Sequence, residues 1–112
     1  MDSMRQQKIN RMIQKELGIA FLREARNLFS GAMVTVTKVH ISKDLAIAKI
    51  YLSIFAHVDK KALLELIRHH GKELRYYLGQ HLHNQLRIIP ELQFFEDDSL
   101  DYIENIDHLL KT

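Results

Sequence analysis

The sequence predicts an α+β fold in which a three-stranded mixed sheet is covered by helices on one face. Three observations lead to this prediction. Apolar residues recur every three or four positions near the N-terminus and again in the middle of the chain, which is typical of helices. Two segments between them are rich in Val, Ile and Thr and alternate in polarity, which is typical of strands. The single proline, Pro90, separates the central helices from a third short strand.

Length and composition indicate one globular domain over residues 1–112. The chain has 112 residues, of which 46% are hydrophobic, enough to bury one core. The absence of cysteine excludes a disulfide scaffold and thiolate chemistry, and favours a cytoplasmic protein. No apolar run approaches the roughly 18 residues of a membrane span. The N-terminus also lacks the apolar segment of a secretory signal, so we expect no membrane partner.

Charge is distributed unevenly along the chain, although the net charge is only +2. Residues 1–90 carry 15 of the 16 basic residues and 7 of the 14 acidic ones, a charge of +8. Residues 91–112 carry 1 basic and 7 acidic residues, a charge of −6. A basic body favours a polyanionic partner such as nucleic acid, although many soluble domains carry a similar excess. The acidic part is predicted to be a helical tail over residues 96–112.

The first predicted element is an amphipathic helix from residue 4 to about residue 25. Its apolar stripe consists of Ile9, Met12, Ile13, Leu17, Ala20 and Phe21. Four cations share one sector beside this stripe: Arg5, Lys8, Arg11 and Lys15. They either contact the phosphates of a nucleic acid or form a solvated helix face.

The first strand is predicted over residues 32–42, with an irregularity in its middle. Val34 and Val36 occupy even positions, whereas Val39 and Ile41 occupy odd positions. One extra residue near Thr37–Lys38 would return all four side chains to one face, which predicts a β-bulge.

A short polar turn, Ser42-Lys43-Asp44, joins this strand to a second one over residues 45–56, forming an antiparallel hairpin. One face of the second strand is apolar and is expected under the helices: Ala46, Ala48, Ile50, Leu52 and Ile54. The other face is mixed. There, Lys38 and Lys49 beside Tyr51 would form a cationic and aromatic surface, or Tyr51 would pack under the last helix.

Two consecutive helices are predicted after the hairpin. Asp59 is a suitable N-cap for a helix over residues 60–69. Helical periodicity resumes at Lys72, with leucines every four residues: Leu74, Leu78, Leu82 and Leu86. Between the helices lies His69-His70-Gly71, and we expect Gly71 to adopt the left-handed conformation that redirects the chain.

The C-terminal part is predicted to add a third strand over Leu92–Phe95 and a last helix capped by Ser99. That helix has an apolar stripe of Leu100, Ile103, Ile106 and Leu110. A strand, a helical crossover and another strand make a parallel pair. The expected strand order is therefore 1-2-3, with strand 2 antiparallel to strand 1 and parallel to strand 3.

This element order is similar to that of the type II KH fold, whose members often bind RNA. Three stretches also resemble the ribosome-binding factor A family. They are residues 5–11; the segments 34–39, 42–45 and 48–53 of the hairpin; and residues 86–100, which include Ile89-Pro90-Glu91-Leu92 and Asp97-Asp98-Ser99-Leu100. The resemblance covers nearly the whole chain.

The resemblance implies a binding protein that has no catalytic site and no cofactor. Members of this family bind free small ribosomal subunits, assist late maturation of their RNA, including processing at the 5′ end, and support growth in the cold. It also implies a tight kink, usually Ala-x-Gly, in place of the Gly-x-x-Gly loop with which KH modules clamp single strands. The kink positions here are His69, His70 and Gly71. We expect a monomer with no small-molecule substrate.

The expected RNA-binding residues form two groups. The first is the cation sector of the N-terminal helix, joined by Lys43 at the hairpin tip. The second comprises the kink residues His69, His70 and Gly71 with the flanking Lys72, Arg75 and Arg87. Arg75 would otherwise pair with Glu73 or Glu65, and Arg87 would otherwise cap a helix end.

Other chemistries are weakly supported. His81 and His83 point about 200° apart on a helix, and the chain has neither a His-Glu-x-x-His pattern nor a cysteine, so no metal site is expected. Glu96, Asp97 and Asp98 are more typical of a solvated turn than of acid–base catalysis. The rival to RNA binding is a protein-interaction adaptor that docks through the acidic tail or the mixed sheet face.

Overall fold

The computed structural model describes residues 2–27, 29, 31–55 and 59–97, and these form a mixed sheet with three helices. The elements in chain order are α1 (Met4–Glu24), β1 (Met33–Ile41), β2 (Ile47–Phe55), α2 (Lys60–His69), α3 (Gly71–Leu82) and β3 (Glu91–Glu96). The predicted α+β class and the order αββααβ are confirmed. The predicted last helix lies outside the described residues.

The sheet has the predicted topology. β1 pairs antiparallel with β2, β2 pairs parallel with β3, and the order is β1-β2-β3. The register shifts between Val36 and Lys38, which confirms the bulge and makes Thr37 the extra residue. The Thr37 hydroxyl donates to the carboxylate of Asp97 at 2.6 Å, so the bulge also holds the chain that leaves β3.

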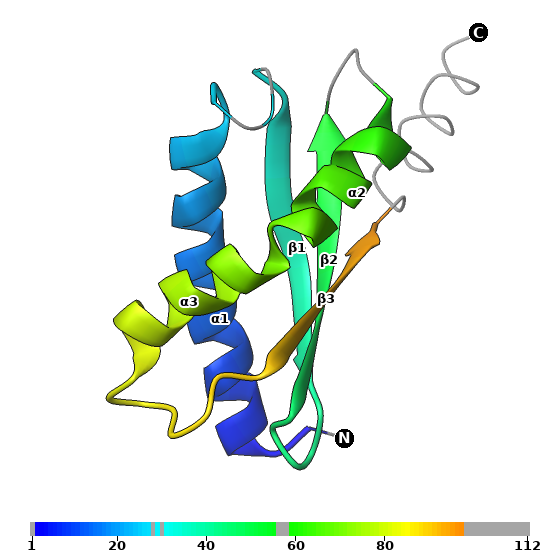
Figure 1. Cartoon of the computed structure of the whole chain (residues 1–112). Helices are drawn as coiled ribbons and strands as arrows, with labels where there is room; N and C mark the ends of the chain where they lie inside the picture. Colours follow the sequence, from blue (N-terminus) through cyan, green and yellow to red (C-terminus); the bar gives the residue numbers. More distant parts are fainter. Residues whose placement is uncertain (1, 28, 30, 56–58, 98–112) are drawn as a thin grey trace, which may run out of the picture.

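The helices pack on one face of the sheet, and the core lies between the two layers. Figure 1 shows α1 running beside β1, while α2 crosses in front of β2 and α3 crosses in front of α1. The buried side chains of the sheet all lie on the helix side: Val34, Val36, Val39, Ile41, Ala48, Ile50, Leu52, Ile54 and Phe94. From α1 they meet Ile9, Ile13, Leu17, Ala20 and Phe21, five of the six residues predicted for its apolar stripe.

Side-chain amides join α1 to β1. Ser3 and Gln6 form a capping box at the start of the helix. The buried Gln6 amide also donates to the carbonyl of Ile41 at 3.1 Å. One turn further on, Asn10 accepts a hydrogen bond from the Ile41 N–H at 2.9 Å, and another turn on, Gln14 donates to the Val36 carbonyl. These bonds satisfy edge groups of β1 and fix the position of α1.

The hairpin turn is longer than predicted. β2 begins at Ile47, so residues 42–46 all lie in the turn, and Ala46 is exposed rather than part of the core. Leu45 has a φ of 62°, a left-handed conformation that is costly for a leucine. Ser42 and Asp44 accept hydrogen bonds from the Ala46 N–H, which hold the chain in this conformation.

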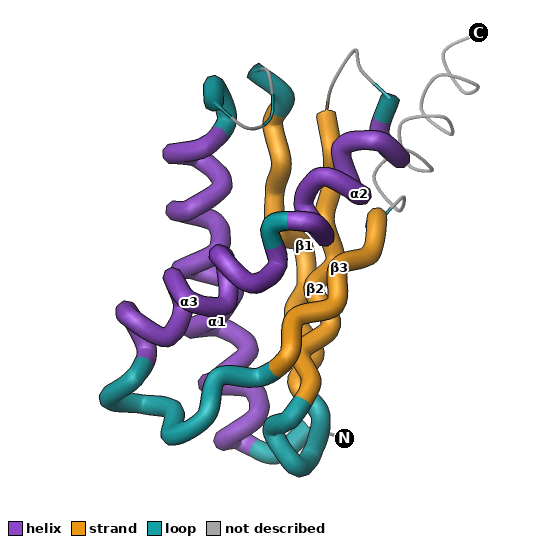
Figure 2. Tube along the Cα trace, viewed as in Figure 1, coloured by secondary structure: helices purple, strands orange, loops and turns teal. Residues whose placement is uncertain are grey.

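The break between α2 and α3 does not use a left-handed glycine, so that prediction is wrong. The break lies at His70, with φ −91° and ψ 15°, and Gly71 is already the first residue of α3. The His70 N–H is shared between the carbonyls of Leu66 and Ile67 at 3.2 and 3.1 Å. Because the chain bends here without reversing, a residue near ψ 0° suffices. Figure 2 shows how short this break is.

The second helix of the pair is also shorter than its leucine pattern predicted. α3 ends at Leu82, and Leu86 is buried from the following turn, not from the helix. Residues 83–90 form the long loop that carries the chain back to β3 (Figure 2). The spacing of leucines every four residues extends beyond the end of α3 because the turn at residues 82–86 directs Leu86 toward the same core.

Candidate nucleic-acid interface

A group of exposed cations lies on the outer side of α1. Ile9, Ile13 and Leu17 fix one side of the helix against the sheet, so the opposite side faces solvent. That side carries the predicted residues Arg5, Lys8, Arg11 and Lys15, all of them exposed. Within the described residues, no hydrogen bond or ion pair occupies their charged groups. We call these four residues the α1 stripe.

The hairpin tip lies at the same end of the molecule as the start of the α1 stripe. The bonds of Gln6 and Asn10 to Ile41 hold the end of β1 against the first turns of α1, and Figure 1 shows the turn beside the N-terminus. Lys43 in this turn is exposed. Its neighbour Asp44 has a lowered pKa because its carboxylate accepts hydrogen bonds from the Ser42 hydroxyl and the Ala46 N–H. The Asp44 carboxylate beside Lys43 is therefore negatively charged at neutral pH.

The kink residues are only partly available to a ligand. His69 is exposed, whereas His70 is half-buried and its Nδ1 lies 3.1 Å from the carboxylate of Glu73. The two imidazole rings meet edge to face with centroids 5.6 Å apart. Gly71 is half-buried at the start of α3, and nothing lies within 4 Å of the space that a Cβ would take.

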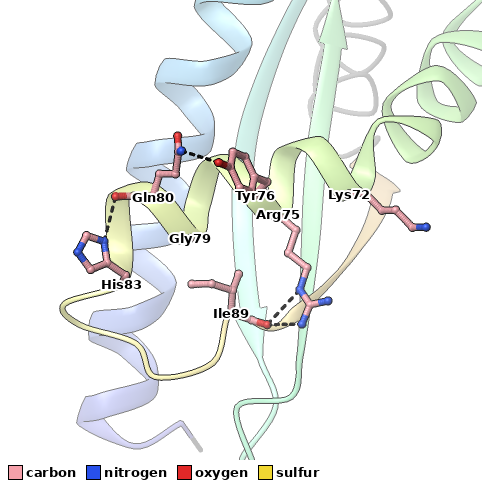
Figure 3. Close-up of a pocket in the computed structure, with 7 residues that line it drawn as sticks. All are labelled: Lys72, Arg75, Tyr76, Gly79, Gln80, His83 and Ile89. Carbon is pink, nitrogen blue, oxygen red and sulfur yellow. Dashed lines mark hydrogen bonds between the residues drawn. The ribbon is translucent and has the colours of Figure 1, made fainter.

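The cations that flank the kink have different roles. The Arg75 guanidinium donates twice to the carbonyl of Ile89, at 2.8 and 3.2 Å, and so ties the loop before β3 to α3 (Figure 3). It pairs with neither Glu73 nor Glu65, because Glu65 binds Arg68 at 2.7 Å. Lys72 points away from this contact and is exposed (Figure 3). Arg87 is exposed in the loop and makes no helix cap within the described residues.

The α1 stripe and the kink form two separate surfaces. His70 lines a cavity of about 350 Å³ together with Ala20 and Phe21, so the kink lies beside the second half of α1. The α1 stripe occupies the first half. Arg5 and Ala20 are about 22 Å apart along the helix axis, at 1.5 Å per residue. An RNA that contacts both Arg5 and the kink must therefore extend along most of α1, whereas Lys15 is only about 8 Å from Ala20 along the axis.

The face of the sheet turned away from the described helices combines aromatic and basic side chains. Tyr51 and Phe95 are partners in the parallel register and stack with centroids 5.6 Å apart. Lys38 lies with its Nζ 6.0 Å from the Tyr51 ring. Of the predicted cationic and aromatic surface, Lys38 therefore lies beside Tyr51 and Lys49 is exposed. Whether the last helix packs on Tyr51 concerns residues outside the described part of the chain.

The described residues provide little for metal or acid–base chemistry. Among them, no three His, Asp or Glu side chains are grouped closely enough to hold a metal ion. His81 and His83 each place Nδ1 near a carbonyl of their own helix turn. Asp97 is half-buried and bonded to Thr37, so it is not the freely solvated residue that we predicted. Asp98 lies outside the described residues.

The sequence analysis did not predict a hollow on α3 beside the kink cations Lys72 and Arg75. The hollow has a volume of about 850 Å³ and contains Tyr76, Gly79, Gln80 and His83 in addition to Lys72 and Arg75. The signal that could have revealed it is two series at helical spacing, Lys72-Tyr76-Gln80 and Arg75-Gly79-His83, which place aromatic, amide and basic groups side by side.

Comparisons of sequence place the chain among well-defined relatives. A family model described as "Ribosome-binding factor A" matches residues 5–110. The ribosome-binding factor A of Cytophaga hutchinsonii is 47% identical over 110 residues, which is 98% of this chain and 83% of that protein. The protein of the same name from Flavobacterium johnsoniae is 43% identical over 111 residues, 98% of this chain and 85% of that protein.

Solved structures show the same fold. A solution structure of a putative ribosome binding factor A from Thermotoga maritima matches 87% of this chain and 91% of its own, with a TM-score of 0.68 and 27% identity. The crystal structure of ribosome-binding factor A from Thermus thermophilus matches 81% of this chain and 94% of its own, with a TM-score of 0.67 and 21% identity.

The family match covers every described element, from the first turn of α1 to the end of β3. In the described part of the chain, no helix is both long enough and apolar enough to span a membrane. On the strength of the family model and these relatives, the chain belongs to the ribosome-binding factor A family.

Proposed function

We propose that this chain binds the free small ribosomal subunit in the cytoplasm and assists late maturation of its RNA, including processing at the 5′ end. It acts as a monomeric binding protein without catalysis. The observation that carries the proposal is the family match over residues 5–110. A Thermus thermophilus homologue, 22% identical to this chain with a TM-score of 0.61, was fitted as a homology model into the map of a 30S complex, which supports the same partner.

The α1 stripe supports a mechanism based on phosphate contacts. Its four cations are exposed and not neutralised by described acidic groups, so their charge is available to an RNA backbone. With Lys43 and Lys72 they offer roughly four to six contacts, which predicts a log–log slope of affinity against salt near −3 to −5.

The helper function follows from differential binding. A protein that binds one RNA conformation more tightly than another shifts the equilibrium toward the first. The chain would thereby stabilise an RNA arrangement that processing enzymes accept. Such help is most needed in the cold, where misfolded RNA rearranges slowly, so loss of the protein should delay growth chiefly at low temperature.

Co-sedimentation tests this proposal. The purified protein is mixed with isolated small subunits, large subunits or joined ribosomes, at low and at moderate salt. Selective retention on small subunits that weakens with salt is the expected result. Equal retention on all three particles would indicate only a generic basic domain. Salt-insensitive binding to a protein, without retention on any RNA, would instead support an adaptor that docks through its tail or mixed sheet face.

A further inference from the structure

The hollow on α3 has a gap at its centre that is created by one missing side chain. Residues four apart on a helix form a ridge, and Arg75, Gly79 and His83 form one whose middle member has no side chain. A Cβ at Gly79 would lie in van der Waals contact with the Cγ1 of Ile89, at 3.5 Å, so the gap between these two residues is a shallow one, about one methyl group in size (Figure 3). We call this gap the Gly79 notch.

An aromatic ring stands beside the notch. Tyr76 is 70% exposed, and its oxygen accepts a hydrogen bond from the Gln80 amide at 2.9 Å (Figure 3). This bond holds the ring in place and leaves the phenolic hydrogen free to be donated to a ligand. A held, solvent-facing ring is a suitable surface for stacking a planar group.

The polar groups around the notch fit a base attached to a phosphate. His83 Nδ1 lies 3.1 Å from the Gln80 carbonyl, so in the neutral ring Nδ1 carries the hydrogen and Nε2 is an acceptor. Lys72 and Arg75 place positive charge at the other end (Figure 3). Among the residues that the structure describes, none that lines the hollow is acidic, which favours an anionic ligand.

We propose that the hollow on α3 binds one unpaired base of an RNA strand, which stacks on Tyr76 and lies across the Gly79 notch, with the adjoining phosphate near Lys72 and Arg75. This proposal rests on the RNA-binding role proposed above and names the ligand of a second surface, distinct from the α1 stripe. The α1 stripe holds phosphates and gives salt dependence. The hollow holds a base over the notch and gives a preference for single-stranded over paired RNA, because a base in a duplex is not free to stack on Tyr76.

Fluorescence of a base analogue tests the notch directly. The probe is a short single-stranded RNA carrying one 2-aminopurine, whose fluorescence is quenched when the base stacks. The wild-type protein should quench it, and the duplex form of the probe should bind more weakly. Tyr76→Ala should abolish the quenching and weaken binding about tenfold, the order expected for one base stacked on an aromatic ring. Tyr76→Phe keeps the ring and should keep the quenching.

Two glycine variants provide a matched comparison. Gly79→Ala and Gly18→Ala both replace a helical glycine, so each should raise the melting temperature through helix propensity. Nothing lies within 4 Å of a Cβ at Gly18, which is outside the hollow. Only Gly79→Ala fills the notch, so only that variant should weaken binding and quenching. Equal binding by the two variants would overturn the proposal.

The salt dependence separates a base site from another phosphate site. Tyr76→Ala removes no charge, so affinity should fall by the same factor at every salt concentration, with an unchanged slope. Unchanged quenching and affinity in Tyr76→Ala, with the wild type still retained on small subunits, would refute the notch and leave the proposed function standing. Tyr76-dependent quenching without retention of the wild type on small subunits would refute the ribosomal role and leave the base site standing.

Discussion

Replacing both Arg5 and Arg11 with glutamate should weaken binding to small-subunit RNA and flatten its dependence on salt. Both residues are exposed on the α1 stripe, about 9 Å apart along the helix axis. If each neutralises one phosphate, the loss of both reduces the log–log slope by about 1.4 to 1.8. At about 0.1 M salt, two such contacts correspond to roughly a 25- to 60-fold loss of affinity from counterion release alone.

The fold should survive this double substitution. Neither side chain contacts the core, and α1 has no acidic residue in its first turn. A glutamate at position 5 would therefore interact favourably with the positive end of the helix, by about 0.3–1 kcal/mol. Thermal unfolding followed by circular dichroism checks that any loss of binding is not a loss of structure.

The assay is filter binding of labelled small subunits at several salt concentrations. The control is Arg23→Glu with Arg26→Glu, which makes the same change in charge beyond the first half of α1, at two exposed positions. The control should keep a slope near that of the wild type. If both double variants flatten the slope equally, net charge and not the α1 stripe determines binding, and the reasoning is refuted.

Three smaller predictions concern the framework that positions these surfaces. Gln6→Ala should lower the free energy of unfolding, measured by chemical denaturation, by about 1–3 kcal/mol, because a main-chain carbonyl of β1 loses its buried donor. A loss below about 0.5 kcal/mol would contradict a stabilising role for this bond. Thr37→Val removes the 2.6 Å bond to Asp97 and should lower stability by about 1–2 kcal/mol, with an unchanged stability as the contrary result. Asp44 has a pKa below 3.8, so its contribution to the hairpin is present above about pH 4 and is lost as pH falls through the folded-state pKa. Ser42→Ala should move that pKa up toward 3.8 in a carbon-detected NMR titration, and no movement would exclude the hydroxyl as the main cause.

Local patterns in the sequence were sufficient for most of the fold. The apolar residues of the first strand switch from even positions, ending at Val36, to odd positions, starting at Val39. This switch predicted the bulge, since a strand with one buried face must keep its apolar residues on that face. Asp59 was predicted as an N-cap and accepts hydrogen bonds from two N–H groups of α2. The exposed position of the α1 stripe followed from helical period alone.

The errors arose where distant segments determine the local conformation. Gly71 was expected to be left-handed, but packing of α3 requires only a bend, which His70 provides. Leu45 takes the left-handed conformation although its side chain disfavours it, because the Ser42 and Asp44 bonds close the turn around it. Glu73 and Glu65 were predicted as alternative partners of Arg75, but its partner is the Ile89 carbonyl, which reaches it only through the return of the loop at residues 83–90.

The central claim is that the α1 stripe lies against the RNA of the small subunit. A photoreactive amino acid at Lys8, compared with the same group at exposed Lys61 in the first turn of α2, tests this contact directly. After irradiation of each variant bound to purified small subunits, we predict cross-links to ribosomal RNA from position 8 and few from position 61. Cross-links to RNA from position 61 with none from position 8 would contradict the account.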